Sequence, residues 1–94
     1  MQYLTLAIVI GLALSGPAAA ECYADYKAKQ DDPLKLAYGV AQVADADCDT
    51  KAAKRALRPR LEAGGWKLLD VMSVFGPEGL AERTDRAGEN FLRY

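Results

Sequence analysis

The chain has 94 residues, with 12 basic and 13 acidic side chains and no His. Its near-neutral charge argues against nucleic acid as a partner, and the lack of His removes the usual general base and a frequent zinc ligand. A chain of this length has room for one small domain.

The N-terminal segment has the features of an export signal. An apolar run extends from Leu4 to Leu14, a helix-breaking Ser-Gly-Pro follows, and Ala18 and Ala20 supply the small residues that signal peptidase requires. We predict a signal peptide over residues 1–20, cleaved after Ala20, and a single domain over 21–94. An uncut anchor is the alternative, although the apolar run is short for a bilayer. The expected location is the periplasm or the extracellular medium.

The remaining chain contains two cysteines, Cys22 and Cys48. In an oxidising compartment two cysteines most simply pair with each other. Such a bridge contributes about 3 to 3.5 kcal/mol through the chain entropy of the unfolded state, which matters for a domain too short to bury a large core. A redox or metal role is the alternative, but the Cys-x-x-Cys spacing is absent.

Alternating patterns predict a β-hairpin at the start of the domain. The segments Cys22 to Lys29 and Leu34 to Val43 alternate apolar or small residues with polar ones, and Asp and Pro between them favour a turn. We expect Gly39 to mark a bulge or a weak point of the second strand. One face of the first strand would hold Cys22, Ala24, Tyr26 and Ala28. The predicted pairs are Lys29 with Leu34 and Cys22 with Ala41.

The next segment is a predicted amphipathic helix from Thr50 to Ala63. Asp49 or Thr50 can cap its first turn, and Gly64-Gly65 can end it. Pro59 cannot donate a hydrogen bond to the Arg55 carbonyl, so we expect a kink there or two short helical pieces. The predicted buried stripe consists of Ala53, Leu57 and Leu61.

The last third of the chain completes an α+β fold. Trp66 to Phe75 is apolar on both faces, which predicts an interior strand. A short polar helix over Leu80 to Ala87 and a closing strand over Asn90 to Tyr94 follow. The prediction is a three- to four-stranded antiparallel sheet, one principal helix kinked near Pro59, a short second helix and one disulfide.

Two sequence resemblances accompany this pattern. The segment Glu62 to Val74, with its Gly-Gly-Trp-Lys-Leu-Leu-Asp-Val core, resembles small bacterial domains of unknown function that carry a Gly-Trp-Glu-Leu-Val-Ser-Val signature. The Cys-Tyr-Ala-Asp-Tyr start of the domain and its Phe-Leu-Arg-Tyr end resemble uncharacterised secreted alphaproteobacterial proteins. These resemblances imply a sheet-plus-helix fold and no known activity.

A cluster of basic residues on the predicted helix is a candidate anion-binding site. The residues fall at i, i+3, i+4 and i+7 and therefore share a helix face. They could bind phosphate, an acidic protein surface or lipid head groups; an ordinary solvated face is the alternative, and a membrane surface is not the favoured target. The cluster consists of Lys51, Lys54, Arg55 and Arg58.

Four aromatic residues are a candidate interface or pocket, because amphipathic aromatics are favoured at binding surfaces. The same residues would otherwise form the core of a small sheet. They are Tyr23, Tyr26, Tyr38 and Trp66. Self-association is one form that such an interface could take.

Metal and catalytic chemistry are weakly supported. Asp45, Asp47 and Asp49 alternate like the start of a calcium loop, but the required Gly and bidentate Glu positions hold other residues. We predict no metal site and no cofactor. Without His, and with both cysteines paired, the usual activated nucleophiles are missing. The chain is therefore predicted to be a non-catalytic binding or protein-interaction module of the cell envelope. An anion-binding module and a small hydrolase, for example through Asp25 and Asp70, are the alternatives.

Overall fold

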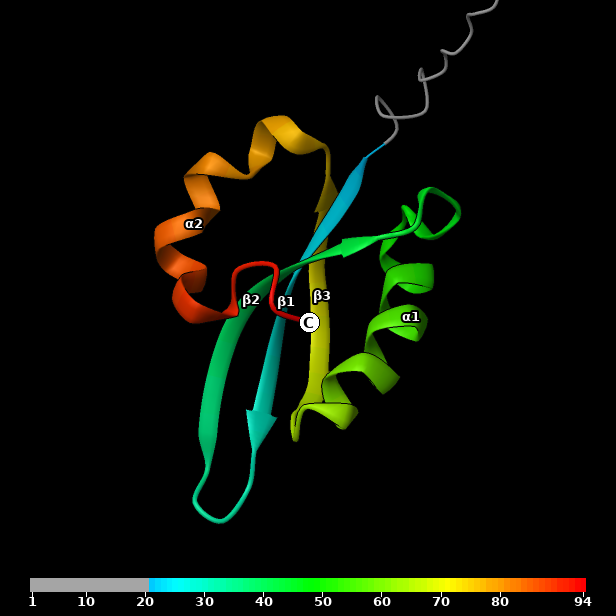
Figure 1. Ribbon diagram of the computed structural model, residues 1–94. Helices are drawn as coiled ribbons and strands as arrows, with labels where there is room; N and C mark the ends of the chain where they lie inside the picture. Colours follow the sequence, from blue (N-terminus) through cyan, green and yellow to red (C-terminus); the bar gives the residue numbers. More distant parts are fainter. Residues whose placement is uncertain (1–20) are drawn as a thin grey trace, which may run out of the picture.

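The computed structural model describes residues 21–94, so the predicted signal peptide lies outside the described residues. The described part of the chain forms three strands and two α-helices, joined by short turns, some of them 3-10 helical. All strand pairs are antiparallel and the sheet order is β2-β1-β3 (Figure 1). The predicted α+β class and the disulfide are confirmed. The elements are β1 (Cys22–Gln30), β2 (Lys35–Val43), α1 (Thr50–Ala63), β3 (Lys67–Phe75) and α2 (Ala81–Ala87).

The prediction that Trp66 to Phe75 is an interior strand is wrong, because β1 occupies the centre and β3 lies at an edge. The ladder between β1 and β3 shifts register twice, which leaves Leu69 and Met72 without partners on β1. Each extra residue reverses the side-chain alternation. Leu68 and Val71 therefore face the same side and are both buried, while Leu69 and Met72 are 46% and 41% exposed.

The hairpin forms with a register two residues from the predicted one. Lys29 pairs with Leu36 and Cys22 pairs with Val43, because Leu34 belongs to the turn rather than to the strand. A shift of two residues preserves the faces, so the small and aromatic residues of β1 do share one side. Gly39 marks no bulge in this ladder. Instead it leaves space for the Tyr26 ring, which a Cβ at this position would overlap.

Helix α1 covers one face of the sheet and forms the larger core. It runs unbroken past Pro59, so the alternative of two short helical pieces is wrong. The predicted stripe is confirmed: Ala53, Leu57 and Leu61 are fully buried against β1 and β3. Gly65, with φ of 87°, ends the helix as a left-handed residue.

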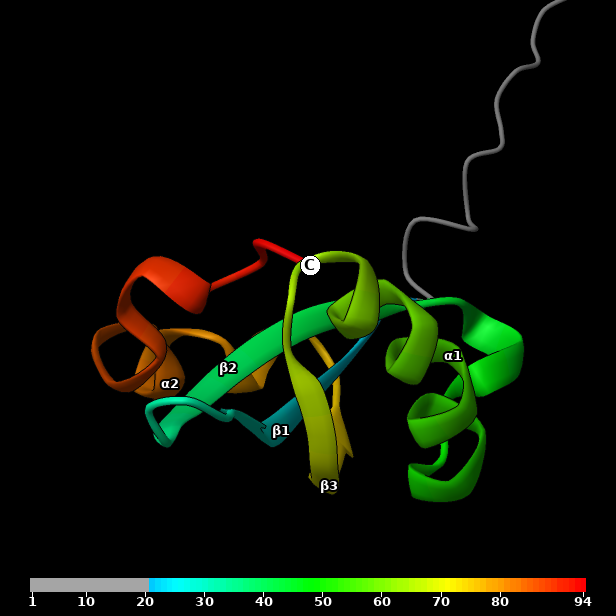
Figure 2. The same cartoon turned by 90° about the horizontal axis from the view of Figure 1, so that it is seen from below.

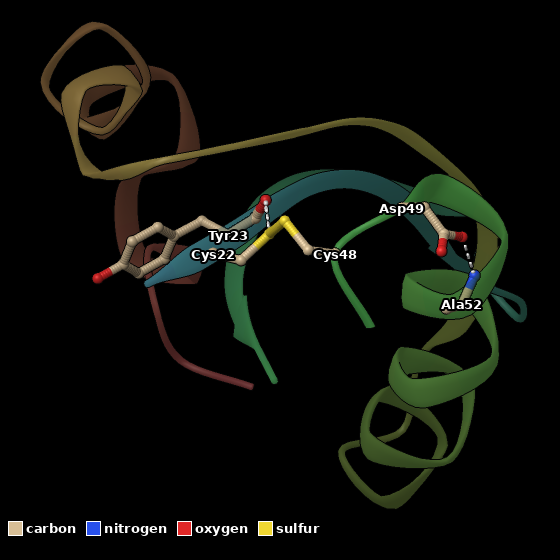
Figure 3. Close-up of a disulfide and its surroundings, with 5 residues drawn as sticks. All are labelled: Cys22, Tyr23, Cys48, Asp49 and Ala52. Carbon is tan, nitrogen blue, oxygen red and sulfur yellow. Dashed lines mark hydrogen bonds between the residues drawn. A yellow bond between two sulfur atoms is a disulfide. The ribbon is translucent and has the colours of Figure 1, made fainter. Parts of the chain in front are cut away.

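The disulfide links the start of β1 to the start of α1. Cys22 and Cys48 are bonded, with their Cα atoms 5.9 Å apart. The Asp49 carboxylate then accepts a hydrogen bond of 2.8 Å from the Ala52 backbone N–H and caps the helix (Figure 3). The covalent link and the cap together fix the first turn of α1 over the sheet.

Helix α2 packs on the opposite face of the sheet, as the two perpendicular views show (Figures 1 and 2). A second core of Tyr23, Val40 and Ala87 lies there, with Phe75 and Phe91 against it. The predicted closing strand at residues 90–94 does not form. In these residues one isolated parallel bridge joins Phe91 to Val40, and Leu92, with φ of 57°, interrupts the extended backbone.

Candidate functional site

A buried carboxylate, Asp25, joins α2 to the sheet. It is 4% exposed and accepts hydrogen bonds from the Tyr38 hydroxyl at 2.8 Å, the Ser73 hydroxyl at 2.7 Å and the Arg83 guanidinium at 3.1 Å. The same guanidinium stacks 4.0 Å from the centre of the Phe75 ring. All three strands and α2 therefore meet at this single carboxylate.

The hydrogen bonds keep Asp25 ionised. Burial raises the pKa of this carboxyl, but the bonds from Ser73, Tyr38 and Arg83 together lower it below its usual range. Burial and the hydrogen bond to Asp25 in turn raise the pKa of Tyr38 to about 12. A carboxylate with a lowered pKa is a weak base near neutral pH. We interpret the cluster as the polar anchor of α2.

Helix α2 covers only part of its face of the sheet and leaves the half nearest the β1–β2 hairpin turn uncovered (Figure 1). Leu36 is 70% exposed there, and Leu69 lines the same hollow of about 240 Å³ together with Lys27 and Tyr38. Lys29 pairs with Leu36 on one side and with Lys67 on the other. We call this surface the open half-face and define it as Lys27, Lys29, Leu36, Tyr38, Lys67 and Leu69.

The open half-face carries positive charge beside its exposed leucines. Within residues 21–94, Lys27 and Lys67 form no ion pair, and Lys29 contacts the turn residue Asp31 at 3.4 Å. At the boundary with α2, the Arg86 guanidinium lies 4.1 Å from the centre of the Tyr38 ring. Apolar side chains bordered by cations that form no ion pair are suited to a partner that offers both apolar and acidic groups.

The predicted basic cluster lies on α1, away from this surface. Lys51, Arg55 and Arg58 are exposed, whereas Lys54 contacts Asp70 of β3 at 3.1 Å. The helix therefore presents three of the four predicted cations to solvent, and the fourth faces the sheet.

The predicted aromatic cluster is divided between the two faces of the sheet. Tyr26 and Trp66 belong to the core under α1, and Tyr23 and Tyr38 to the core under α2. The Trp66 indole donates to the Tyr94 hydroxyl at 3.1 Å. Of the four residues, Tyr38 alone is placed on the open half-face. They do not line one common pocket.

The acidic residues before α1 are placed as a turn and a cap. Asp45 and Asp47 lie in a 3-10 turn, and Asp49 caps the helix. Within the described range 21–94, no three His, Cys, Asp or Glu side chains are grouped as a metal site would require. No helix in that range has the length and apolarity needed to cross a bilayer. Asp25 and Asp70 have different partners, Arg83 and Lys54.

Comparisons of this chain with protein-family models, curated proteins and solved structures give no match in any of the three.

The open half-face was not predicted from the sequence. Of its residues, only Tyr38 was a predicted interface candidate. The exposure of Leu36 could not be predicted, because an inward position of this residue fits the alternating pattern of the strand equally well.

Proposed function

We propose that this is an exported, non-catalytic protein that binds another protein of the cell envelope through the open half-face. The observation that carries the proposal is the combination of exposed Leu36 and Leu69 with Lys27 and Lys67, two lysines that form no ion pair within residues 21–94, on one side of the sheet. A hollow lined by exposed apolar side chains and bordered by charge is suited to an interaction site.

Export is supported by the uncharged N-terminal segment and by the disulfide, which fits an oxidising environment. The resemblance to secreted proteins is consistent with it. Edman sequencing of the protein from the periplasm or the medium should start at Glu21. A start at Met1, or recovery from the cytosol alone, would contradict this part of the proposal.

The absence of catalysis is supported by the state of the candidate groups. Both cysteines are bonded, and Ser73, the one Ser in residues 21–94, donates its hydroxyl to Asp25. The pKa of Asp25 is lowered, whereas a general base near neutral pH needs a raised one.

Site-specific photocrosslinking in intact cells of the source organism tests the proposed surface. A photoreactive phenylalanine analogue at Leu36 or Leu69 should give one discrete adduct with another protein. The same analogue at Lys51 or Glu62, which are exposed on α1, should not give that adduct. Changing Lys27 and Lys67 together to Glu should abolish it. Equal adducts from both surfaces, or none from the open half-face, would refute the proposal.

Anion binding by α1 is the second candidate, favoured by the exposure of Lys51, Arg55 and Arg58. If it is correct, replacing these three residues with Gln weakens binding to vesicles of anionic lipid or to heparin. Unchanged binding would eliminate it.

A further inference from the structure

The outer edge of β2 has backbone groups without hydrogen-bond partners within residues 21–94. The inference drawn from them rests on the proposed function and specifies how the partner protein is bound. The Val40 carbonyl accepts from the Leu92 N–H at 2.8 Å, and the Gln42 carbonyl accepts from Arg60 at 2.9 Å. In an antiparallel pair, backbone groups alternate between partner and outside. The backbone N–H and C=O groups of Leu36 and Tyr38 therefore also point away from β1. No hydrogen bond within residues 21–94 reaches these groups.

The β2 edge is more suitable for strand addition than the β3 edge. The pairing of β2 with β1 is continuous over all nine residues, whereas β3 contains two register shifts. Bulges protect an edge because they interrupt the regular spacing of its donors and acceptors. The C-terminal segment already occupies the β2 edge at Val40 through a parallel bridge, so the free stretch ends there.

A hollow of about 550 Å³ runs beside this free stretch. Trp66 reaches it from the α1 side of the sheet and Arg86 from the α2 side, so it lies along the edge itself. Lys35 and Arg86 line it and form no ion pair within residues 21–94, whereas the acidic residue in its lining, Glu89, lies 3.8 Å from Arg93. The edge therefore has a surplus of positive charge.

We propose that the free edge of β2 at Leu36 and Tyr38 receives an extended acidic segment of the partner protein as a fourth strand. Backbone hydrogen bonds to Leu36 and Tyr38 provide the pairing, as in other cases of strand addition. Acidic side chains of the segment meet Lys35 and Arg86, and alternate apolar side chains lie against Leu36 on the open half-face.

Amide hydrogen exchange measured by NMR tests the pairing directly. The probe is a blocked peptide of alternating Glu and Val residues, added at millimolar concentration to the disulfide-bonded domain. In the free protein the Leu36 and Tyr38 amides exchange rapidly because they lack an acceptor. With the peptide, exchange at these two amides slows by at least about tenfold, and the Lys-Val counterpart binds at least about tenfold more weakly.

Two variants at one position separate the backbone from the side chain. Leu36→Thr removes the apolar side chain but keeps the N–H, whereas Leu36→Pro also removes the N–H, which an edge strand tolerates on its outward side. We expect Leu36→Pro to weaken peptide binding at least about tenfold beyond Leu36→Thr. Circular dichroism and intact disulfide mass confirm that both variants are folded.

The outcomes distinguish this inference from the proposed function. Peptide binding on the open half-face without protection of Leu36 and Tyr38, or equal binding by both variants, overturns strand addition but not the proposed function. No binding by the acidic peptide also overturns strand addition. Protection of these amides in the peptide-free protein, together with dimers in light scattering, would identify a second copy as the occupant and overturn the acidic partner. Failure of the cellular crosslinking would overturn both.

Discussion

Two buried polar side chains of β1 differ in whether they are hydrogen-bonded. Asp25 has partners for both carboxylate oxygens, whereas the Tyr26 hydroxyl is buried without a partner in residues 21–94. Burial raises the pKa of Tyr26 to about 12. A buried polar group without a hydrogen bond destabilises the folded state, so removing that group should stabilise it. Removing one partner of a buried hydrogen bond destabilises the folded state, because the other partner stays buried and unpaired. Substitutions at the two positions should therefore have opposite effects.

Tyr26→Phe should stabilise the domain. The change removes an unpartnered hydroxyl and keeps the ring that packs against Gly39, so the free energy of unfolding should rise by about 1 kcal/mol. Urea denaturation measures it. Tyr23→Phe is the control, since that hydroxyl donates to Glu21 at 2.8 Å and its loss should not stabilise. A less stable Tyr26→Phe would indicate a partner for the hydroxyl.

Asp25→Asn should destabilise the domain by about 3 kcal/mol near neutral pH, because Arg83 loses a buried partner. The folded pKa of Asp25 lies below its usual value, so its contribution is complete above about pH 5 and is lost progressively as the pH falls further. The difference between wild type and variant should therefore shrink in acid. Urea denaturation over a pH series tests this, with exposed Asp85→Asn as the control. A difference independent of pH would exclude the charge as its cause.

At the level of elements, sequence patterns correctly predicted features within one helix or turn. They did not predict how the strands are arranged in the sheet. The cap at Asp49, the buried stripe ending at Leu61 and the turn near Pro33 were all predicted correctly. The edge position of β3 was not, because the bulges at Leu69 and Met72 give this edge strand apolar residues on both faces of its alternation, as in an interior strand. A bulge depends on the partner strand and leaves no mark in the alternation of one strand.

Helix α1 contains an exposed proline that weakens it. Pro59 leaves the Arg55 carbonyl without its helical donor. Pro59→Ala should stabilise the domain by about 2 kcal/mol, since the helical preference of about 3 kcal/mol exceeds the entropy that the unfolded chain regains. Thermal and urea unfolding measure the change. Arg58→Ala, also exposed, should alter stability by less than about 0.5 kcal/mol. If Pro59→Ala were destabilising, the proline ring would have to contribute packing.

For the whole molecule, the sheet is covered unequally. One face lies under the 14 residues of α1 and the other under the seven of α2, so the hairpin extends beyond the shorter helix and its outer half stays open (Figure 1). The sequence shows two helices of unequal length but not the position of the shorter one along the sheet. That position depends on the hydrogen bond between Arg83 and Asp25, which are 58 residues apart in the sequence. The hydrophobic periodicity of one helix or strand does not indicate such a long-range contact.

The disulfide should supply a large share of the stability of this small domain. Cys22 and Cys48 are 26 positions apart, and closing a loop of that length corresponds to about 3.5 kcal/mol of unfolded-state entropy. Replacing both cysteines with Ser should lower the free energy of unfolding by about that amount, out of roughly 5 kcal/mol available to a domain of this size. Urea denaturation monitored by Trp66 fluorescence measures the loss. Wild-type protein treated with reductant should match the double variant, because both lack the same constraint. Equal midpoints for oxidised and reduced wild type would mean that the cores under α1 and α2 hold the fold without the covalent link.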